Sequence, residues 1–294
     1  MNAQELNKKI TIRNLVIFTV IVLTIGFIGR GLDVAMGNPT RESLGILLWI
    51  SMPLVTSLIL RLFAGDGWKD FGIKPNCKGN LGWYLFAVLV FPFVTAVILL
   101  VGYAFGLITF PEASAATLGL FIQAFALAML PNLIKNFFEE AAWRGYLTPK
   151  IFSLGINDFI GHTIVGVIWG VWHIPYYLFY EDPAVLQEFT TLNMATYIPL
   201  AIVVMIAWAF VYGEIRLLTN SIWPVILMHA VEDAFLFALI LDHHIVIRQG
   251  MDWLISPMNG LVCVALFLVI GVGLRQWRKR KNKSLVTESL GLTV

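Results

Sequence analysis

The chain has 294 residues, of which 59% are hydrophobic and 13% are charged, and its net charge is +2. Soluble domains carry about 25% charged residues, so this composition excludes a water-soluble protein. The mean hydropathy of +0.81 and the apolar stretches of about 20 residues predict membrane-spanning helices, because backbone polar groups in lipid must be satisfied within each segment. The same stretches exclude a transmembrane β-barrel, whose strands are shorter and alternate in hydrophobicity.

Apolar segments along the chain predict an all-α, polytopic membrane bundle of about eight helices. These segments are Asn14–Gly29, Leu44–Phe63, Leu81–Leu107, Thr117–Phe138, Phe159–Tyr180, Ala195–Tyr212, Ile222–Ile240 and Ile255–Leu274. We expect one membrane domain over residues 1–283, with a core of about residues 117–240. A disordered tail is expected at residues 284–294.

The positions of lysine and arginine predict the orientation of the chain. With eight spans and a cytoplasmic N-terminus, all but three of the 20 basic residues fall on the cytoplasmic side; the exceptions are Arg30, Arg41 and Arg248. This distribution follows the positive-inside rule, so we expect a multi-pass protein of the cell membrane with both termini in the cytoplasm. The basic tail Arg275–Lys283 is interpreted as a topology anchor that contacts anionic lipid. Nothing in the sequence supports nucleic-acid binding.

Two adjacent carboxylates, Glu139 and Glu140, stand at the end of the fourth segment. On a helix, Glu140 and Arg144 are one turn apart and can pair, whereas Glu139 points roughly 100° away. The two acids then lie in different environments, which is how two carboxylates take different catalytic roles. The plainer interpretation is that both acids only mark the cytoplasmic end of this span.

Two histidines lie inside later apolar segments, where an ionisable side chain is costly and is by default a functional hypothesis. His173 follows Trp169 and Trp172 and precedes Pro175, which interrupts the helix hydrogen bonds and can leave a carbonyl free. The alternative is a core histidine bonded to the carbonyl of a neighbouring helix.

The second histidine, His229, has Asp233 one helical turn later on the same face. A carboxylate in this position can orient the imidazole or share a ligand with it, and Glu232 can compete for that partnership. The alternative is a polar seam that joins helices. Unrelated polar residues would be spread over all the apolar segments, whereas here they occur on three of them. This distribution favours one shared pocket with a general base, an imidazole and oxyanion donors.

These motifs resemble those of the CAAX prenyl protease and bacteriocin-processing family of intramembrane proteases, also called the type II CAAX or Abi family. The motifs EExxxR, FxxxH and HxxxN/D correspond here to Glu139-Glu140-x-x-x-Arg144, Trp169-x-x-x-His173 and His229-x-x-x-Asp233. Trp169 replaces the usual phenylalanine and keeps an aromatic wall. The resemblance covers roughly residues 120–237.

The resemblance implies a helical-bundle endopeptidase that cleaves a peptide or membrane-protein substrate in a membrane-buried site open to the cytoplasm. It implies that Glu139 and His173 activate the attacking water, and that His229 and Asp233 stabilise the oxyanion. Glu140 and Arg144 would support them. An ionised aspartate cannot donate a hydrogen bond, so Asp233 must be protonated or must only orient His229.

The sequence does not decide whether the site uses a metal ion. Glu139, His173 and His229 match a catalytic zinc set with one open position, and the family label is metalloprotease-like. The alternative is a metal-free mechanism that uses Glu139 with His173 alone. His243 and His244, beside Asp242 in a loop, can bind a metal only weakly and are interpreted as solvated.

The depths of the site residues pose a geometric problem. At 1.5 Å per residue, His173 lies roughly 20 Å into its span and His229 roughly 10 Å into its own, whereas Glu139 stands at a span end. Either the fifth span begins later, with residues 151–162 as a separate cytoplasmic segment, or the fourth span continues past Glu140.

Two further expectations concern the fifth span. Gly166 and Gly170, four residues apart, predict a close approach by another helix. His162, at the start of this span, is expected at the membrane interface.

Two other classes of function compete with the peptidase. A proton- or ion-coupled transporter would use the same ionisable groups as a relay. A catalytically silent membrane scaffold or immunity factor would need none of them, yet every motif position is present. The substrate and the oligomeric state do not follow from the sequence.

Overall fold

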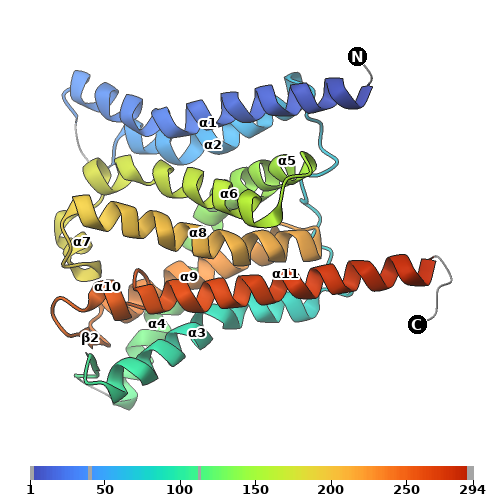
Figure 1. The fold of residues 1–294 in the computed structure, drawn as a ribbon. Coiled ribbons are helices and arrows are strands. Elements are labelled where there is room, and N and C mark those ends of the chain that lie inside the picture. Colours follow the sequence, from blue (N-terminus) through green and yellow to red (C-terminus); the bar gives the residue numbers. More distant parts are fainter. Residues whose placement is uncertain (1–2, 39–41, 112–113, 290–294) are drawn as a thin grey trace.

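A computed structural model describes residues 3–38, 42–111 and 114–289 (Figure 1). The helices are α1 (Ala3–Ala35), α2 (Leu44–Phe63), α3 (Leu81–Ala104), α4 (Ala115–Ala142), α5 (Thr148–Ser153), α6 (Asp158–Trp172), α7 (Pro183–Phe189), α8 (Met194–Thr219), α9 (Trp223–Leu241), α10 (Asp252–Ile255) and α11 (Leu261–Ser289). Two π-helical turns are η1 (Trp143–Leu147) and η2 (Tyr176–Tyr180). The strands β1 (Ile108–Thr109) and β2 (Val246–Ile247) pair antiparallel, with Ile108 opposite Ile247. The all-α fold class is confirmed.

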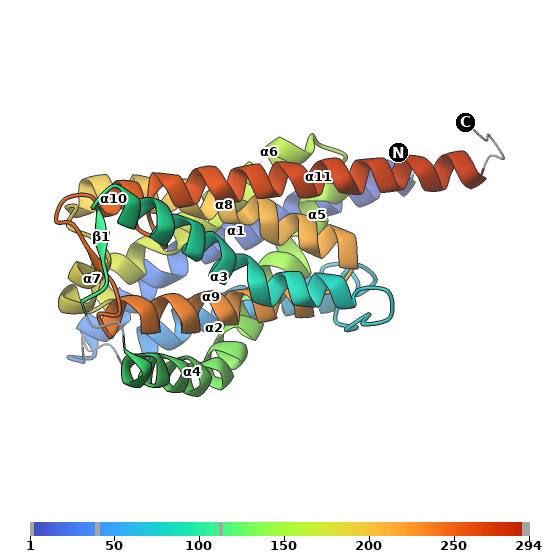
Figure 2. The same ribbon diagram turned by 90° about the horizontal axis from the view of Figure 1, so that it is seen from below.

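The long helices run side by side along one common direction (Figures 1 and 2). The helix α8 packs against α6 and α11, while α9 packs against α3 and α4, and α1 covers α2. Large apolar side chains such as Leu85, Leu127 and Val269 are exposed on the outer helices, as expected of a bundle whose outer surface faces lipid. Both chain termini lie at the same end of the bundle, here called the terminal end, and α7 and α10 lie at the opposite end (Figure 1).

Within the described ranges, seven helices are long and apolar enough to cross a membrane. They match seven of the eight expected spans. The fifth expected span, Phe159–Tyr180, is not one helix, because α6 ends at Trp172 and η2 begins at Tyr176. Pro175 has no backbone N–H to continue the ladder, and this explains the break beside His173.

The fourth span does not end before the paired acids. It continues through α4, η1 and α5 as one helical segment, Ala115–Ser153, of 39 residues. Counted at 1.5 Å per residue, Glu139 lies about 36 Å from the start of this segment and about 21 Å from its end. Of the two solutions to the depth problem, the continuation past Glu140 is therefore confirmed, and the acids lie inside the bundle.

Two glycines of α6 allow α8 to approach closely, as expected. A Cβ atom at Gly166 would lie 2.4 Å from the Ile206 Cα, and one at Gly170 would lie 2.9 Å from the Ile202 Cα. Both distances are below van der Waals contact with backbone, so only glycine fits. This contact sets the position of the C-terminal end of α6, from which His173 follows.

Hydrogen bonds between ionisable side chains join α6, α8 and α11 near the terminal end. His162 is fully buried between helices, with Nε2 2.9 Å from the Glu214 Oε1, and its place at the membrane interface stays a prediction. Arg278 donates to the same carboxylate at 2.6 Å, and Arg275 donates to Asp158 at 2.9 Å. Part of the basic tail thus holds helices together, in addition to its expected role as an anchor.

The end of α11 overlaps the expected disordered tail. The helix continues to Ser289, while residues 290–294 lie outside the described residues. The order of the tail stays a prediction.

A larger side chain at Gly166 tests the contact between α6 and α8. We expect Gly166→Leu to destabilise the protein by about 1–3 kcal/mol, the usual cost of overpacking, because the added atoms would meet the backbone of α8. The control is Gly119→Leu, since a Cβ at Gly119 has nothing within 4 Å. The readout is the thermal unfolding temperature of the purified protein in detergent. Equal temperatures for both variants would contradict the close approach.

Candidate active site

The sequence-predicted site residues surround one cavity of about 140 Å³ between α4, α9 and the break after α6. Glu139, His173, His229 and Asp233 all line it. The convergence that the sequence suggests is therefore present. Glu140 and Arg144 lie directly behind this lining and are fully buried.

Glu140 links a guanidinium and an imidazole through one oxygen. Arg144 Nη1 donates to Glu140 Oε1 at 2.9 Å, and His229 Nδ1 lies 2.8 Å from the same oxygen. The Arg144 guanidinium also lies between two rings, 4.1 Å from the centroid of Trp169 and 4.6 Å from that of Tyr212. Flat cation–π contacts of this kind suit a buried arginine. The predicted Glu140–Arg144 pair exists, and it orients His229.

Arg144 lies in the π-helical turn η1. A π turn shifts the backbone hydrogen bonds from i+4 to i+5, and such turns recur at functional sites. Two carbonyls of η1 accept from arginines of other helices: Arg144 O from Arg216 Nε at 2.9 Å, and Gly145 O from Arg61 Nη2 at 2.6 Å. The same arginines hold the loop between α2 and α3, since Arg61 also pairs with Asp70 at 2.7 Å. Burial alone would raise the pKa of Asp70, but the charges of Arg61 and Lys150 outweigh it and lower this pKa.

The end of α6 fixes the tautomer of His173. Its Nδ1 lies 2.9 Å from the Trp169 carbonyl oxygen, which can only accept, so Nδ1 carries the hydrogen. Its Nε2 is then left with a free lone pair. The backbone N–H of His173 bonds to Gly170 instead, which releases the Trp169 carbonyl for the side chain. A histidine with one nitrogen held in this way presents the other as a base or a ligand.

Stacked rings form one wall of the cavity. Trp49 lies between Trp172 and Tyr176, with ring centroids 4.0 and 4.9 Å away and nearly parallel planes. Its Nε1 donates to the Trp172 carbonyl at 2.9 Å. His173 stacks on Tyr177 at 5.8 Å.

Lys135 and Asn136 are site residues that our sequence reasoning missed. Lys135 Nζ lies 2.9 Å from Asp233 Oδ2 and 3.7 Å from Glu139 Oε1. Asn136 Nδ2 donates to Asp233 Oδ2 at 2.7 Å. We counted Lys135 only as a topology marker, although its position four residues before Glu139 could have identified it. With two donors on one oxygen, Asp233 acts as an acceptor.

The donor atoms that could share a metal differ from the expected set. His229, Glu232 and Asp233 offer atoms within 4.8 Å of one another, and neither Glu139 nor His173 belongs to this group. His229 has its second nitrogen on a carboxylate, as metal-bound histidines do. However, the Lys135 ammonium lies 2.9 Å from Asp233, and a divalent cation at that carboxylate would be repelled by it. The residues present therefore do not fit a resident ion.

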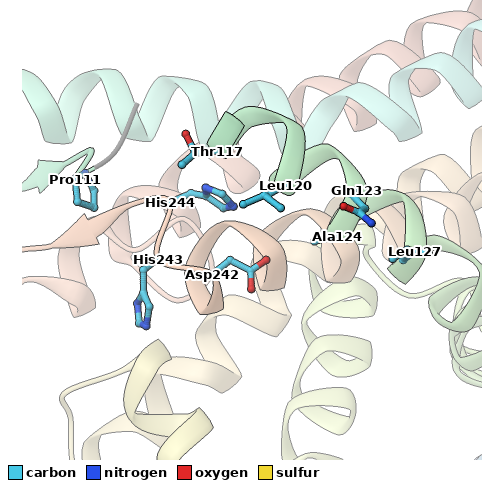
Figure 3. Close-up of a pocket in the computed structure, with 9 residues that line it drawn as sticks. All are labelled: Pro111, Thr117, Leu120, Gln123, Ala124, Leu127, Asp242, His243 and His244. Carbon is cyan, nitrogen blue, oxygen red and sulfur yellow. The ribbon is translucent and has the colours of Figure 1, made fainter. Parts of the chain in front are cut away.

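The loop histidines face different neighbours (Figure 3). His244 lies against α4, with its ring 5.4 Å from that of Phe121, whereas His243 lies 3.7 Å from Glu188. In Figure 3 the two imidazoles point in different directions along the pocket beside Asp242. They form no joint ligand set with each other.

The cavity extends toward the end of the bundle that holds α7 and α10. Its lining continues from Glu139 to Glu181, Leu186 and Asn259, which lie in the connections at that end. Both termini lie at the opposite end (Figure 1). The cytoplasmic location of the termini and the cytoplasmic opening of the site both stay predictions.

Residues 122–235 match the family model described as type II CAAX prenyl endopeptidase Rce1-like. The resemblance to the CAAX protease family is confirmed. The matched segment contains the whole set from Glu139 to Asp233 and indicates an intramembrane protease of the CAAX type in a multi-pass membrane protein. No curated protein matches the chain.

Removing the buried guanidinium tests how far the core of the bundle depends on Arg144. We expect Arg144→Ala to cost about 3–5 kcal/mol of stability, because it leaves Glu140 buried without its partner. Arg144→Lys should rescue this loss poorly, since an ammonium cannot stack flat between Trp169 and Tyr212. The measurements are the yield and thermal unfolding temperature of the purified protein. Arg248→Ala, at an exposed loop position, is the control, and equal unfolding of Arg144→Ala and wild type would contradict the role.

Proposed function

We propose that this protein is an endopeptidase of the cell membrane that hydrolyses a peptide bond with a water activated by Glu139 and His173. One observation carries the proposal: a carboxylate and two oriented imidazoles from separate segments line one membrane-buried cavity. Either imidazole alone could be a core histidine. Together with Glu139 they supply the groups that acyl hydrolysis needs.

Glu139 is the general base in this proposal. Its side chain is 3% exposed, and its Oε2 has no hydrogen-bond partner among the described residues. A water between Glu139 and the free Nε2 of His173 would be held by both. As that oxygen attacks the scissile carbonyl, its proton passes to the Glu139 carboxylate, which later returns it to the leaving amine.

His229 and Lys135 are the proposed oxyanion stabilisers. Glu140 Oε1 lies 2.8 Å from His229 Nδ1 and orients the imidazole, so Nε2 is the nitrogen offered to the oxyanion. Lys135 supplies an ammonium at the rim of the cavity, with a side chain that is 42% exposed. Asp233 holds this ammonium and does not itself donate. This division of roles removes the need for a protonated aspartate.

A metal-free mechanism is favoured over a zinc mechanism. The positive charge that a zinc ion would supply at the carbonyl is here supplied by Lys135, whose ammonium lies against Asp233. The catalytic steps above use only side chains of this chain. The transporter alternative is not favoured, because the side of the site nearest the terminal end is closed by Trp143, Arg144 and Trp169, all fully buried.

Single substitutions test the roles of the cavity residues. Glu139→Gln and His173→Ala should each lower kcat/KM by at least about 10²-fold, the usual contribution of a general base or its partner. Lys135→Met should lower kcat by about 10²–10³-fold, as expected for loss of an oxyanion donor. The assay is cleavage of a quenched fluorescent peptide library by purified protein in detergent, with equal folded protein verified by gel filtration. Glu188→Gln, an exposed acid outside the cavity, is the control. Normal turnover by Glu139→Gln would exclude the assignment.

Chelation tests the choice between the two mechanisms. We expect peptide cleavage to be unchanged after prolonged dialysis against EDTA or 1,10-phenanthroline, because no step requires an ion. Elemental analysis of the active protein should find well under one zinc per chain. Loss of cleavage with chelator, and its return with added zinc, would decide for the metal mechanism.

A further inference from the structure

An apolar groove lies on the outside of the bundle, between α1 and the pair α5 and α6 (Figure 1). Its volume is about 340 Å³, and ten of its eleven lining residues are apolar. On α1 these residues include Ile12, Val16 and Val20, which are 44%, 57% and 56% exposed. Residues four apart lie above one another on a helix, so the groove follows one face of α1.

The opposite wall comes from the segment that follows the paired acids. Leu147 ends η1, Ile151 belongs to α5 and Ile164 belongs to α6. Leu147 lies three residues after Arg144, in the same π-helical turn. A molecule in the groove would therefore contact α1 and the turn that carries Arg144 at the same time.

The dimensions of the groove suit a hydrocarbon chain. From Ile12 to Val20 the groove extends about 12 Å along α1, close to the roughly 15 Å that half of a bilayer's hydrocarbon core measures. A helix with its side chains is about 10–12 Å across, and a groove of about 340 Å³ is too small to seat one. The groove thus fits an acyl chain of one leaflet and not a further helix.

Two lysines stand at one end of the groove. Lys8 and Lys9 precede Ile12 by four and three residues, so they lie on its side of α1, about 5–6 Å farther along the axis. Both side chains are exposed, and neither makes an ion pair or a side-chain hydrogen bond within the described part of the chain. Glu5, on the same face, lies one turn farther from the groove.

Other cations near this end are bound to oxygens of the chain itself. Arg13 Nη2 donates to Ala64 O at 3.1 Å. Lys150 Nζ donates to Asp66 O at 2.8 Å. The two lysines of α1 instead offer their ammonium groups to an anion from outside, and their apolar stems let them reach the head-group region from the helix.

We propose that this groove binds one anionic phospholipid, with an acyl chain between α1 and α5–α6 and the head group at Lys8 and Lys9. Basic side chains at the membrane surface attract anionic lipid, and the groove adds a fixed place for the chain beside them. The inference is independent of the proposed peptidase function. The bound lipid would join α1 to the segment that contains Arg144.

Two phospholipids that differ only in the charge of their head group test the proposal. Delipidated protein in detergent is titrated with dioleoylphosphatidylglycerol or with dioleoylphosphatidylcholine, and the affinity for the first bound lipid is measured by native mass spectrometry. We expect the wild type to bind the anionic lipid about 10-fold or more tightly than the zwitterionic one, because each nearby lysine favours it. Equal affinities for the two lipids would overturn the proposal.

A double variant, Lys8→Gln with Lys9→Gln, tests the head-group contact. It should lose the preference for the anionic lipid, and its exposed positions make a folding defect easy to exclude by gel filtration. The control is Lys74→Gln with Lys78→Gln, two exposed lysines that do not line the groove, and this variant should keep the preference. A preference retained by the first variant would overturn the proposal and assign the lipid to another basic site, such as the tail.

A larger side chain inside the groove tests the contact with the acyl chain. Val16→Trp should weaken the binding of both lipids several-fold, because the indole takes the volume and the contacts of the chain. The control is Val34→Trp, at a position of α1 that is 58% exposed and does not line the groove. Unchanged affinity of folded Val16→Trp protein for the anionic lipid would contradict a chain in the groove.

Discussion

The ion pair between Arg144 and Glu140 is the interaction on which the geometry of the site depends. Both side chains are fully buried, and their 2.9 Å contact lies within one helical segment. The pair reaches further because Glu140 also holds His229 of α9, while Arg144 rests on Trp169 of α6 and Tyr212 of α8. Four helices therefore meet at one guanidinium. A buried pair of this kind adds little net stability but is costly to break, which makes it suited to fixing an arrangement.

The sequence predicted which residues line the cavity better than it predicted their depth. The spacing of Glu139, Glu140 and Arg144, the two lone histidines and the Gly166–Gly170 pair each led to a correct placement. The break after α6 was foreseeable from Pro175, although we drew one unbroken span there. The continuation of α4 past Glu140 was one of two alternatives drawn from the sequence. The π turn η1 within it was not foreseeable, because two of its carbonyls accept from Arg61 and Arg216 of other helices.

Residues that act through partners far away in the sequence were missed for the same reason. Lys135 and Asp233 are close in space but come from α4 and α9, so the charge pattern along one helix shows only the contact of Lys135 with Glu139. The burial of His162 was missed because its partner Glu214, which also accepts from Arg278, belongs to another helix. Local spacing along the sequence identifies pairs within one helix, whereas pairs between helices can be identified only from the packing of the bundle.

A hydrolytic site inside a membrane must admit water without making a pore. In this bundle the polar groups on the cavity side are reached from the α7 end, and the groups behind them are sealed by Trp143, Trp169 and a stacked guanidinium. These closing residues include charged groups, which are costly in lipid unless each charge has a partner. The contacts of Glu140 with Arg144 and His229 provide such partners. The residues that orient the imidazole are thus the same residues that close the site toward the terminal end, so the geometry of His229 and this barrier depend on one set of contacts. Opening the site toward the terminal end would require breaking the contacts that hold His229 in place.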